Sequence, residues 1–219
     1  MNTPAALEGI SGSGSARSRL LTVVSAALAV AMALFAAAPA AQSAGAPEDF
    51  LESYGDRAIA VLGDDSQSEA QRREAFRDLL AEGFDLESIS AFVLTSYWRQ
   101  ASEAQRSNFI AAFQSVLAAR FLPLFNGAKS DSFAIENTRS ISGRDDLFSV
   151  ETVLVGNQGR RVRTSWRIKK VDGNFQILDV AVEGASMAHT FRDEYRAFVR
   201  RSDQGLDGLI QQLQKQASG

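Results

Sequence analysis

The spacing of apolar residues divides this chain into a helical part and a strand part. From residue 47 to residue 124, apolar side chains recur every three or four positions, which is the spacing of one face of an α-helix. The pattern predicts four helices, over residues 47–63, 68–83, 85–94 and 102–124. Ser102 and Gln105 form a capping box before the longest of them, which carries an apolar line through Phe109, Phe113 and Leu117.

From residue 132 the period changes from about 3.6 to two, which is typical of strands. Four strands are predicted, over residues 132–140, 146–156, 160–171 and 174–184. Their connections, GRD, GNQG and VDGN, are short and rich in turn residues, so the strands should form an antiparallel meander. Helices over residues 186–199 and 205–216 follow. The predicted fold is α+β, with a four-stranded antiparallel twisted sheet packed against several helices.

The third predicted strand has one apolar and one basic face. Val162, Thr164, Trp166 and Ile168 alternate with a basic ladder made of Arg161, Arg163, Arg167 and Lys169. Such a ladder is typical of a solvated sheet face that discourages edge pairing. The ladder would also suit a docking surface for an acidic partner or for lipid head groups, in a protein whose core is solid. The sequence leaves both the solvated face and the docking surface open.

The N-terminus has the layout of a secretory signal peptide. Arg17 and Arg19 precede an uncharged run over residues 20–38, and the small residues PAAQSAGA follow it. An uncleaved membrane anchor is the alternative, but the run is mostly alanine and its small-residue exit suits a signal peptidase. We therefore expect residues 1–44 to be a cleaved signal peptide and residues 45–219 to be a single domain, exported to the periplasm.

Composition narrows the functional classes. The formal net charge is −3, so the chain lacks the basic surface that nucleic acid requires. With no cysteine it has no disulfide framework and no thiolate nucleophile. Fourteen phenylalanines beside three tyrosines and two tryptophans supply apolar bulk with few polar groups, which suits either a large dry core or a dry cavity.

Catalytic patterns are weak. Gly184 and Ser186 approach a nucleophile elbow, but the sole histidine, His189, lies on the same helical turn as Ser186 and is expected to be unable to face it as a base. Ser186 is better interpreted as a helix cap. Asp179 and Glu183 are about 13 Å apart along one strand, too far to act on one bond. We expect no enzyme activity, no metal site and no cofactor.

Four stretches resemble the MlaC family of periplasmic lipid carriers. They are FDLESISAFVLTSYWRQAS, SEAQRSNFIAAF, LDVAVEGASMAHTFRDEY and GLDGLIQQL, in the expected order across most of the chain. The resemblance implies a domain that holds phospholipid acyl chains in an apolar cavity between sheet and helices. It also implies two partners, an inner-membrane ABC transporter complex and an outer-membrane lipoprotein complex, between which the carrier shuttles lipid.

The family supplies no catalytic set, so the expected cavity wall is taken from apolar facing alone. It comprises Phe92, Tyr97, Phe109, Phe113, Leu117, Phe121, Val153, Trp166, Ile168, Val180 and Met187. An acyl chain buried there would gain roughly 0.8 kcal/mol per methylene, so binding needs no reactive residue. Two alternatives stay open: a carrier of hopanoids or other apolar ligands, and a small hydrolase or isomerase on a similar cone-shaped scaffold with Asp179 or Ser186 in its pocket.

Overall fold

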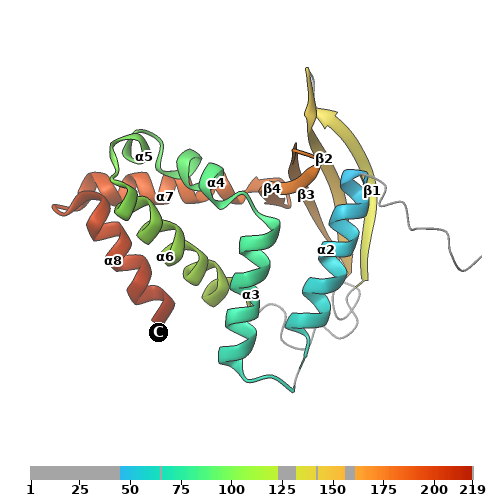
Figure 1. The fold of residues 1–219 in the computed structure, drawn as a ribbon, viewed down its shortest axis with the longest axis horizontal. Helices are drawn as coiled ribbons and strands as arrows, with labels where there is room; N and C mark the ends of the chain where they lie inside the picture. The colour runs from blue at the N-terminus through green and yellow to red at the C-terminus, as the bar shows by residue number, and fades with distance from the viewer. Residues whose placement is uncertain (1–44, 65, 123–131, 142, 156–160, 219) are drawn as a thin grey trace, which may run out of the picture. The chain divides into compact units, whose positions relative to one another are not determined.

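Seven helices and one antiparallel sheet make up the described part of the chain (Figure 1). The structure is a computed structural model that describes residues 45–64, 66–122, 132–141, 143–155 and 161–218. The described residues all belong to one compact unit. The predicted signal peptide, residues 1–44, lies outside the described residues. Within those residues, none of the helices has the length and apolarity needed to cross a membrane.

The helices largely follow the predicted pattern. They are α2 (Pro47–Leu62), α3 (Glu69–Gly83), α4 (Leu86–Leu94), α5 (Ser96–Gln100), α6 (Glu103–Phe121), α7 (Met187–Arg201) and α8 (Gly205–Ser218). Ser68 and Ser102 accept hydrogen bonds from the amides of Gln71 and Gln105, which confirms the two capping boxes. The short α5 was not predicted, because the break before it depends on the backbone of Thr95, which has φ 56° and ψ −116°.

The sheet has five strands, so the prediction of four was wrong. The strands β1 (Ser132–Ile141), β2 (Arg144–Val155), β3 (Arg161–Val171), β4 (Asn174–Val182) and β5 (Ala185–Ser186) pair antiparallel in chain order. Glu183 and Gly184 both have positive φ, 49° and 84°, as a tight two-residue hairpin requires. The chain therefore turns back along β4 before α7 begins. Two residues are too few to show a period in the sequence.

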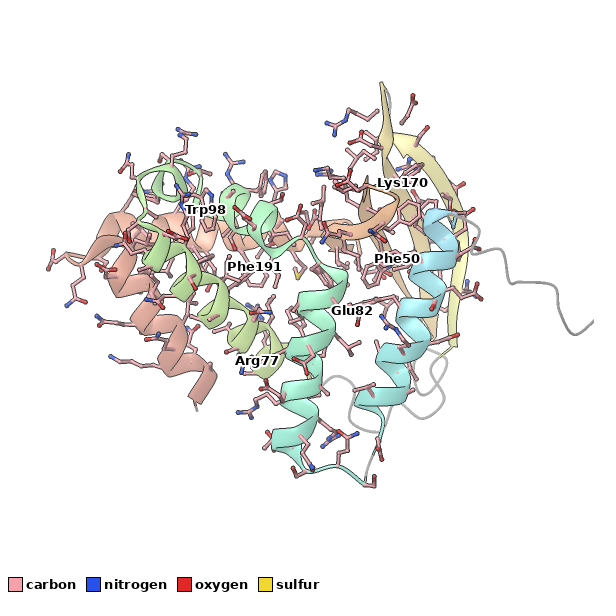
Figure 2. All side chains as sticks on the ribbon, in the orientation of Figure 1. Phe50, Arg77, Glu82, Trp98, Lys170 and Phe191 are labelled. Carbon is pink, nitrogen blue, oxygen red and sulfur yellow. The ribbon has the colours of Figure 1, made fainter. Side chains whose placement is uncertain are left out.

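One face of the sheet is covered by α2 (Figure 1). The cluster between them, called the sheet cluster here, consists of Leu51, Tyr54, Leu79, Leu122, Val150, Ile168, Phe175 and Ile177. Phe50 of α2 lies 5.9 Å from Phe175 of β4 between ring centroids, and Figure 2 shows Phe50 beside the strands. The alternation predicted for β3 is confirmed, because Thr164 and Ile168 are buried whereas Arg163 and Arg167 are exposed.

A second cluster, called the helical cluster, lies among α3 to α8. Its buried members are Leu80, Ile89, Val93, Leu94, Trp98, Phe109, Ala112, Phe113, Val116, Leu117, Phe191, Tyr195, Val199, Leu209, Ile210 and Leu213. Aromatic rings interlock at its centre. The ring of Phe113 is 5.2 Å from Phe191 and 6.0 Å from Tyr195, both in edge-to-face contact.

Helix α3 connects the two clusters. Phe76 within this helix and Phe84 directly after it pack against both the sheet cluster and the helical cluster. The backbone then joins the sheet directly, because the amide of Asp85 donates to the carbonyl of Ile177 in β4 at 3.0 Å. We call the line where the clusters meet, marked by Phe76 and Phe84, the seam.

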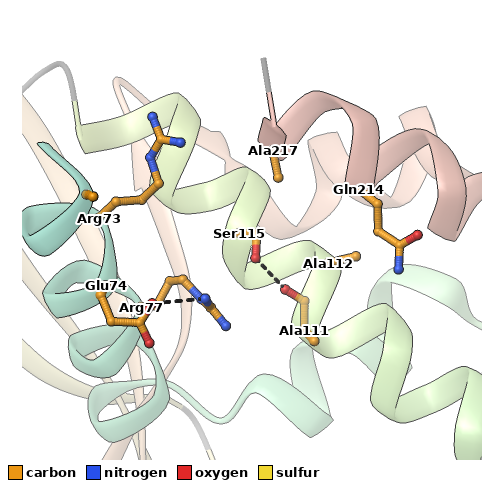
Figure 3. A pocket seen from close by; sticks show the side chains of 9 residues that line it. Arg73, Glu74, Arg77, Ala111, Ala112, Ser115, Gln214 and Ala217 are labelled. Carbon is orange, nitrogen blue, oxygen red and sulfur yellow. Dashed lines mark hydrogen bonds and ion pairs between the residues drawn. The ribbon is translucent and has the colours of Figure 1, made fainter.

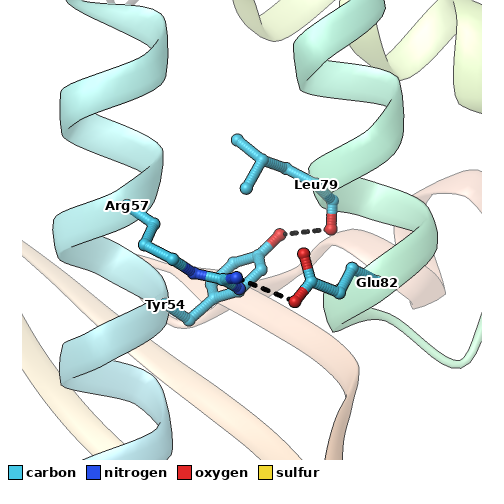
Figure 4. Close-up of polar contacts among 4 residues, drawn as sticks. All are labelled: Tyr54, Arg57, Leu79 and Glu82. Atoms are coloured by element: carbon cyan, nitrogen blue, oxygen red, sulfur yellow. Dashed lines mark hydrogen bonds and ion pairs between the residues drawn. The ribbon is translucent and has the colours of Figure 1, made fainter.

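Close contacts between α2 and α3 hold the sheet side of the seam (Figure 4). The Tyr54 hydroxyl donates to the Leu79 carbonyl at 2.9 Å, and Arg57 pairs with Glu82 at 2.8 Å. Gly83 lies directly against the Tyr54 ring, so that a Cβ at this position would clash with it. The absence of a side chain at residue 83 allows this approach.

Candidate functional site

The structure divides the eleven predicted wall residues between the two clusters. Six belong to the helical cluster or pack against it: Tyr97, Phe109, Phe113, Leu117, Phe121 and Met187. Three belong to the sheet cluster or pack against it: Trp166, Ile168 and Val180. Val153 is buried outside both clusters, and Phe92 is exposed. The predicted set is therefore not one contiguous wall, although both groups border the seam-forming helix α3.

The members of this set differ in how tightly they are held. Phe109 and Phe113 are 0% and 1% exposed and are enclosed by rings of α7, so they act as the centre of the helical cluster. Phe121, Trp166, Val180 and Met187 are half-buried. A ligand that enters between the clusters would cover half-buried carbon without separating the interlocked rings. These four residues, with Phe76 and Phe84, are therefore the better candidates for ligand contact.

Two of the hollows in the described part of the chain can be compared with the predicted wall, and neither is lined by a predicted wall residue. The larger, of about 420 Å³, lies between α3, α6 and α8 (Figure 3). Ala111, Ala112 and Ala217 contribute apolar surface to it, and Arg73 and Arg77 lie along its α3 side. The smaller, of about 180 Å³, is on the sheet beside Arg163 and Glu151. The predicted apolar cavity between sheet and helices stays a prediction.

Sequence reasoning missed a hydroxyl pair beneath Trp166. The indole nitrogen of Trp166 donates to the Thr152 hydroxyl at 3.0 Å, and Thr152 also shares a hydrogen bond with Thr164. Both threonines are buried, at 1% and 5% exposure. The pair satisfies the one polar atom of the indole and fixes the ring against the sheet. Because threonine is common in strands, no sequence signal marks these two positions.

The junction of β4 and α7 is held by Asp179. Its carboxylate accepts hydrogen bonds from the Ser186 hydroxyl at 2.6 Å and from the Ala188 amide at 3.0 Å. The Ser186 oxygen in turn accepts from the His189 amide at 3.1 Å, which confirms the predicted helix cap. The carboxylate also lies at the positive end of the α7 dipole. Asp179 and Ser186 thus form an anchor for α7.

The remaining residues considered for chemistry have local structural partners. Glu183 accepts from the backbone amide of Arg163 at 2.8 Å. The His189 ring is in edge-to-face contact with Phe92, with centroids 5.0 Å apart. Among the residues that the structure describes, no group of three or more histidine, aspartate or glutamate side chains is placed to hold a metal ion.

The exposed sheet face carries charges of both signs. Arg161 of the basic ladder pairs with Glu136 at 3.3 Å, and Arg139 pairs with Glu151 at 2.6 Å. One of the four ladder residues is therefore paired with a carboxylate of β1, and exposed pairs of this kind contribute little stability. Away from this face, burial changes the acidity of two tyrosine side chains. Desolvation raises the pKa of the Tyr54 and Tyr195 phenols well above the ordinary value.

Comparison with known proteins relates the sequence and the fold of this chain to a family and to a solved structure. The pattern of the MlaC protein family matches residues 52–215. The toluene tolerance protein ttg2D of Pseudomonas putida is 21% identical over 173 residues, which cover 77% of this chain and 80% of that protein. A phospholipid-binding protein from Ralstonia solanacearum, solved in complex with a phospholipid, has a similar fold, with a TM-score of 0.67 at 18% identity. That match covers 77% of this chain and 94% of the other.

Proposed function

This chain belongs to the MlaC family, and from that premise we propose that it is a periplasmic carrier that binds phospholipid through its acyl chains. It would be exported by a cleaved signal peptide at residues 1–44, leaving one lipid-binding domain over residues 45–219. The carrier would exchange lipid with an inner-membrane ABC transporter complex and an outer-membrane lipoprotein complex. No chemical step is required, because transfer needs only burial and release of the tails.

The observation that carries the proposal is the division of the interior into two hydrophobic clusters that meet at α3. A tail lying along the seam would contact carbon on both sides, from the half-buried Trp166 and Val180 of the sheet and Phe121 and Met187 of the helices. Each methylene that leaves water would contribute roughly 0.8 kcal/mol. The proposal is also supported by the Ralstonia solanacearum protein, which has a similar fold and was solved in complex with a phospholipid.

Retained lipid provides the direct test. Purified protein should release phospholipid into organic solvent, detected by mass spectrometry, and the delipidated protein should take up labelled phospholipid. The absence of lipid from the extract, together with no uptake, would overturn the proposal. A polycyclic lipid in the extract would instead identify the hopanoid alternative.

A matched pair of variants tests the location. Val180→Trp places a large side chain against the sheet cluster and should reduce bound lipid severalfold by occupying the seam. Val171→Trp introduces the same change at another half-buried position, at the end of β3, and should leave loading unchanged. Equal loading of both variants would place the lipid elsewhere.

A further inference from the structure

Helix α7 carries a group of arginines without ion-pair partners. Several arginines of α2, α3 and the sheet are held in ion pairs, for example Arg57 with Glu82 and Arg139 with Glu151. Within the described part of the chain, no acidic partner is found for Arg192, Arg196, Arg200 and Arg201. The same holds for Arg163 and Arg167 of β3. In a protein whose formal net charge is −3, four such arginines on one helix are a local concentration of positive charge.

Three of these residues lie on one flank of the helix. Arg192, Arg196 and Arg200 follow at intervals of four, so they form a line about 12 Å long, here called the arginine stripe. Arg192 and Arg196 are half-buried and Arg200 is exposed. Asp193 adjoins the stripe, whereas Glu194 projects from the opposite flank of the helix. The flank keeps an excess of positive charge.

An exposed aromatic ring lies at the start of the stripe. Phe92 of α4 is 36% exposed, which is unusual among the large hydrophobic side chains that the structure describes. The Arg192 guanidinium carbon lies 5.0 Å from its ring centroid, and the His189 ring is 5.0 Å from it on the same side of α7. An apolar side chain thus projects at the edge of a cationic surface.

We propose that the arginine stripe and Phe92 form a docking surface for an anionic lipid bilayer. The guanidinium groups would bind lipid phosphates while Phe92 enters the interface between head groups and acyl chains. Binding to the membrane would be reversible, because three arginines and one aromatic ring give weak, salt-sensitive binding. This surface is separate from the seam.

A bilayer suits this surface better than an acidic protein does. The three charges are carried on long side chains along one flank of a helix, and none of them lines either of the two hollows described above. Lipid head groups can rearrange laterally to meet such a line, whereas a protein partner would need matching, fixed carboxylates. The exposed ring would gain nothing from an acidic polypeptide but can be buried in a membrane.

Vesicle sedimentation tests the proposal. The purified protein should sediment with vesicles of phosphatidylcholine containing 30% phosphatidylglycerol at low salt, and should not sediment with pure phosphatidylcholine vesicles or in 0.5 M salt. Replacing all three residues, Arg192→Gln, Arg196→Gln and Arg200→Gln, should weaken binding about a hundredfold, from about fivefold for each arginine. The double variant R196Q/R200Q leaves the Arg192–Phe92 contact intact and should lose about 25-fold.

The matched control removes three arginines from the sheet instead, as R161Q/R163Q/R167Q, and should retain vesicle binding. Equal loss in this control would show that net charge alone is responsible and would overturn the proposal. Phe92→Ala should weaken vesicle binding but leave binding to soluble polyglutamate unchanged. Arginine-dependent binding to polyglutamate without binding to the anionic vesicles would also overturn it, in favour of an acidic protein partner.

Lipid uptake from detergent solution is measured in parallel. It should be unchanged in the stripe variants, because the stripe does not line the seam. A wild-type protein that takes up lipid but ignores vesicles would refute the docking surface and leave the carrier function standing. A wild-type protein that binds vesicles but takes up no lipid would refute the carrier function and leave the docking surface standing.

Discussion

At the residue scale, two polar side chains have consequences that burial alone would not reveal. Asp179 was considered in the sequence for its possible chemistry, yet its carboxylate joins β4 to the first turn of α7. Tyr54 carries a buried phenol whose hydroxyl joins α2 to α3. Their types and positions are visible in the sequence, but their partners are not, because Asp179 and Ala188 meet only after the chain reverses at Glu183 and Gly184.

Asp179→Ala should destabilise the domain by about 2 to 3 kcal/mol, because a helix cap and a hydrogen bond to a charged group are lost together. The measurement is urea unfolding, with a lower midpoint at unchanged slope. Asp193→Ala removes an exposed carboxylate of α7, the helix that Asp179 anchors, and should change stability by less than about 0.5 kcal/mol. A similar loss in both variants would contradict the anchoring role of Asp179.

Tyr54 predicts a change of stability at alkaline pH. Burial raises the pKa of its phenol in the folded state above the unfolded value of about 10. The phenol therefore supports folding fully below pH 10, and this support declines as pH rises from 10 towards the folded pKa. Tyr54→Phe should lower the free energy of unfolding by about 1 kcal/mol at pH 7, since the hydrogen bond to Leu79 is lost.

The difference between wild type and Tyr54→Phe should shrink, and then reverse, as the pH rises above 10. Unfolding measured at steps from pH 7 to pH 11 gives the comparison, and Tyr97→Phe, at a half-buried tyrosine with no such bond to α3, is the control. A difference that stays constant across this range would contradict a raised pKa at Tyr54.

At the scale of elements, hydrophobic period and capping residues were sufficient to predict six of the seven described helices and the four long strands. The remainder depended on backbone geometry. Helix α5 follows Thr95 at positive φ, and β5 follows two residues at positive φ. Threonine and glutamate rarely adopt this conformation, so the sequence at Thr95 and Glu183 gave no warning of it.

The contact between α2 and α3 depends on the missing side chain at Gly83. Gly83→Ala would place a methyl group against the Tyr54 ring and should destabilise the domain by about 1 to 3 kcal/mol. Thermal unfolding measures this loss. In a Tyr54→Leu background, the same substitution should be less harmful because the obstructing ring is gone. An equal loss in both backgrounds would show that the cause is not this clash.

At the scale of the whole domain, the sequence identified inward-facing residues but not the clusters they join. Phe113 and Trp166 both face inward, yet one is at the centre of the helical cluster and the other is at the side of the sheet cluster. Periodicity shows which side of an element is apolar and carries no information on the neighbour it meets. A continuous wall was therefore expected where the structure has two clusters and a seam.

If lipid lies along the seam, it should stabilise the entire domain. A ligand present at a hundred times its dissociation constant adds about 2.7 kcal/mol to the free energy of unfolding. The delipidated protein should therefore melt at a lower temperature and recover when phospholipid is restored, as measured by calorimetry. Val180→Trp should show little recovery, and full recovery in that variant would contradict binding at the seam.

The hydrogen bond from the Asp85 amide to the Ile177 carbonyl offers a way to time these events. If the clusters part at α3 and β4 to admit a tail, this amide loses its acceptor at that moment and its proton can exchange with deuterium. Under conditions in which the opened amide exchanges faster than the seam recloses, the rate of deuterium incorporation at Asp85 equals the rate of opening. That opening rate is an upper limit on how fast the protein can load or unload lipid through the seam.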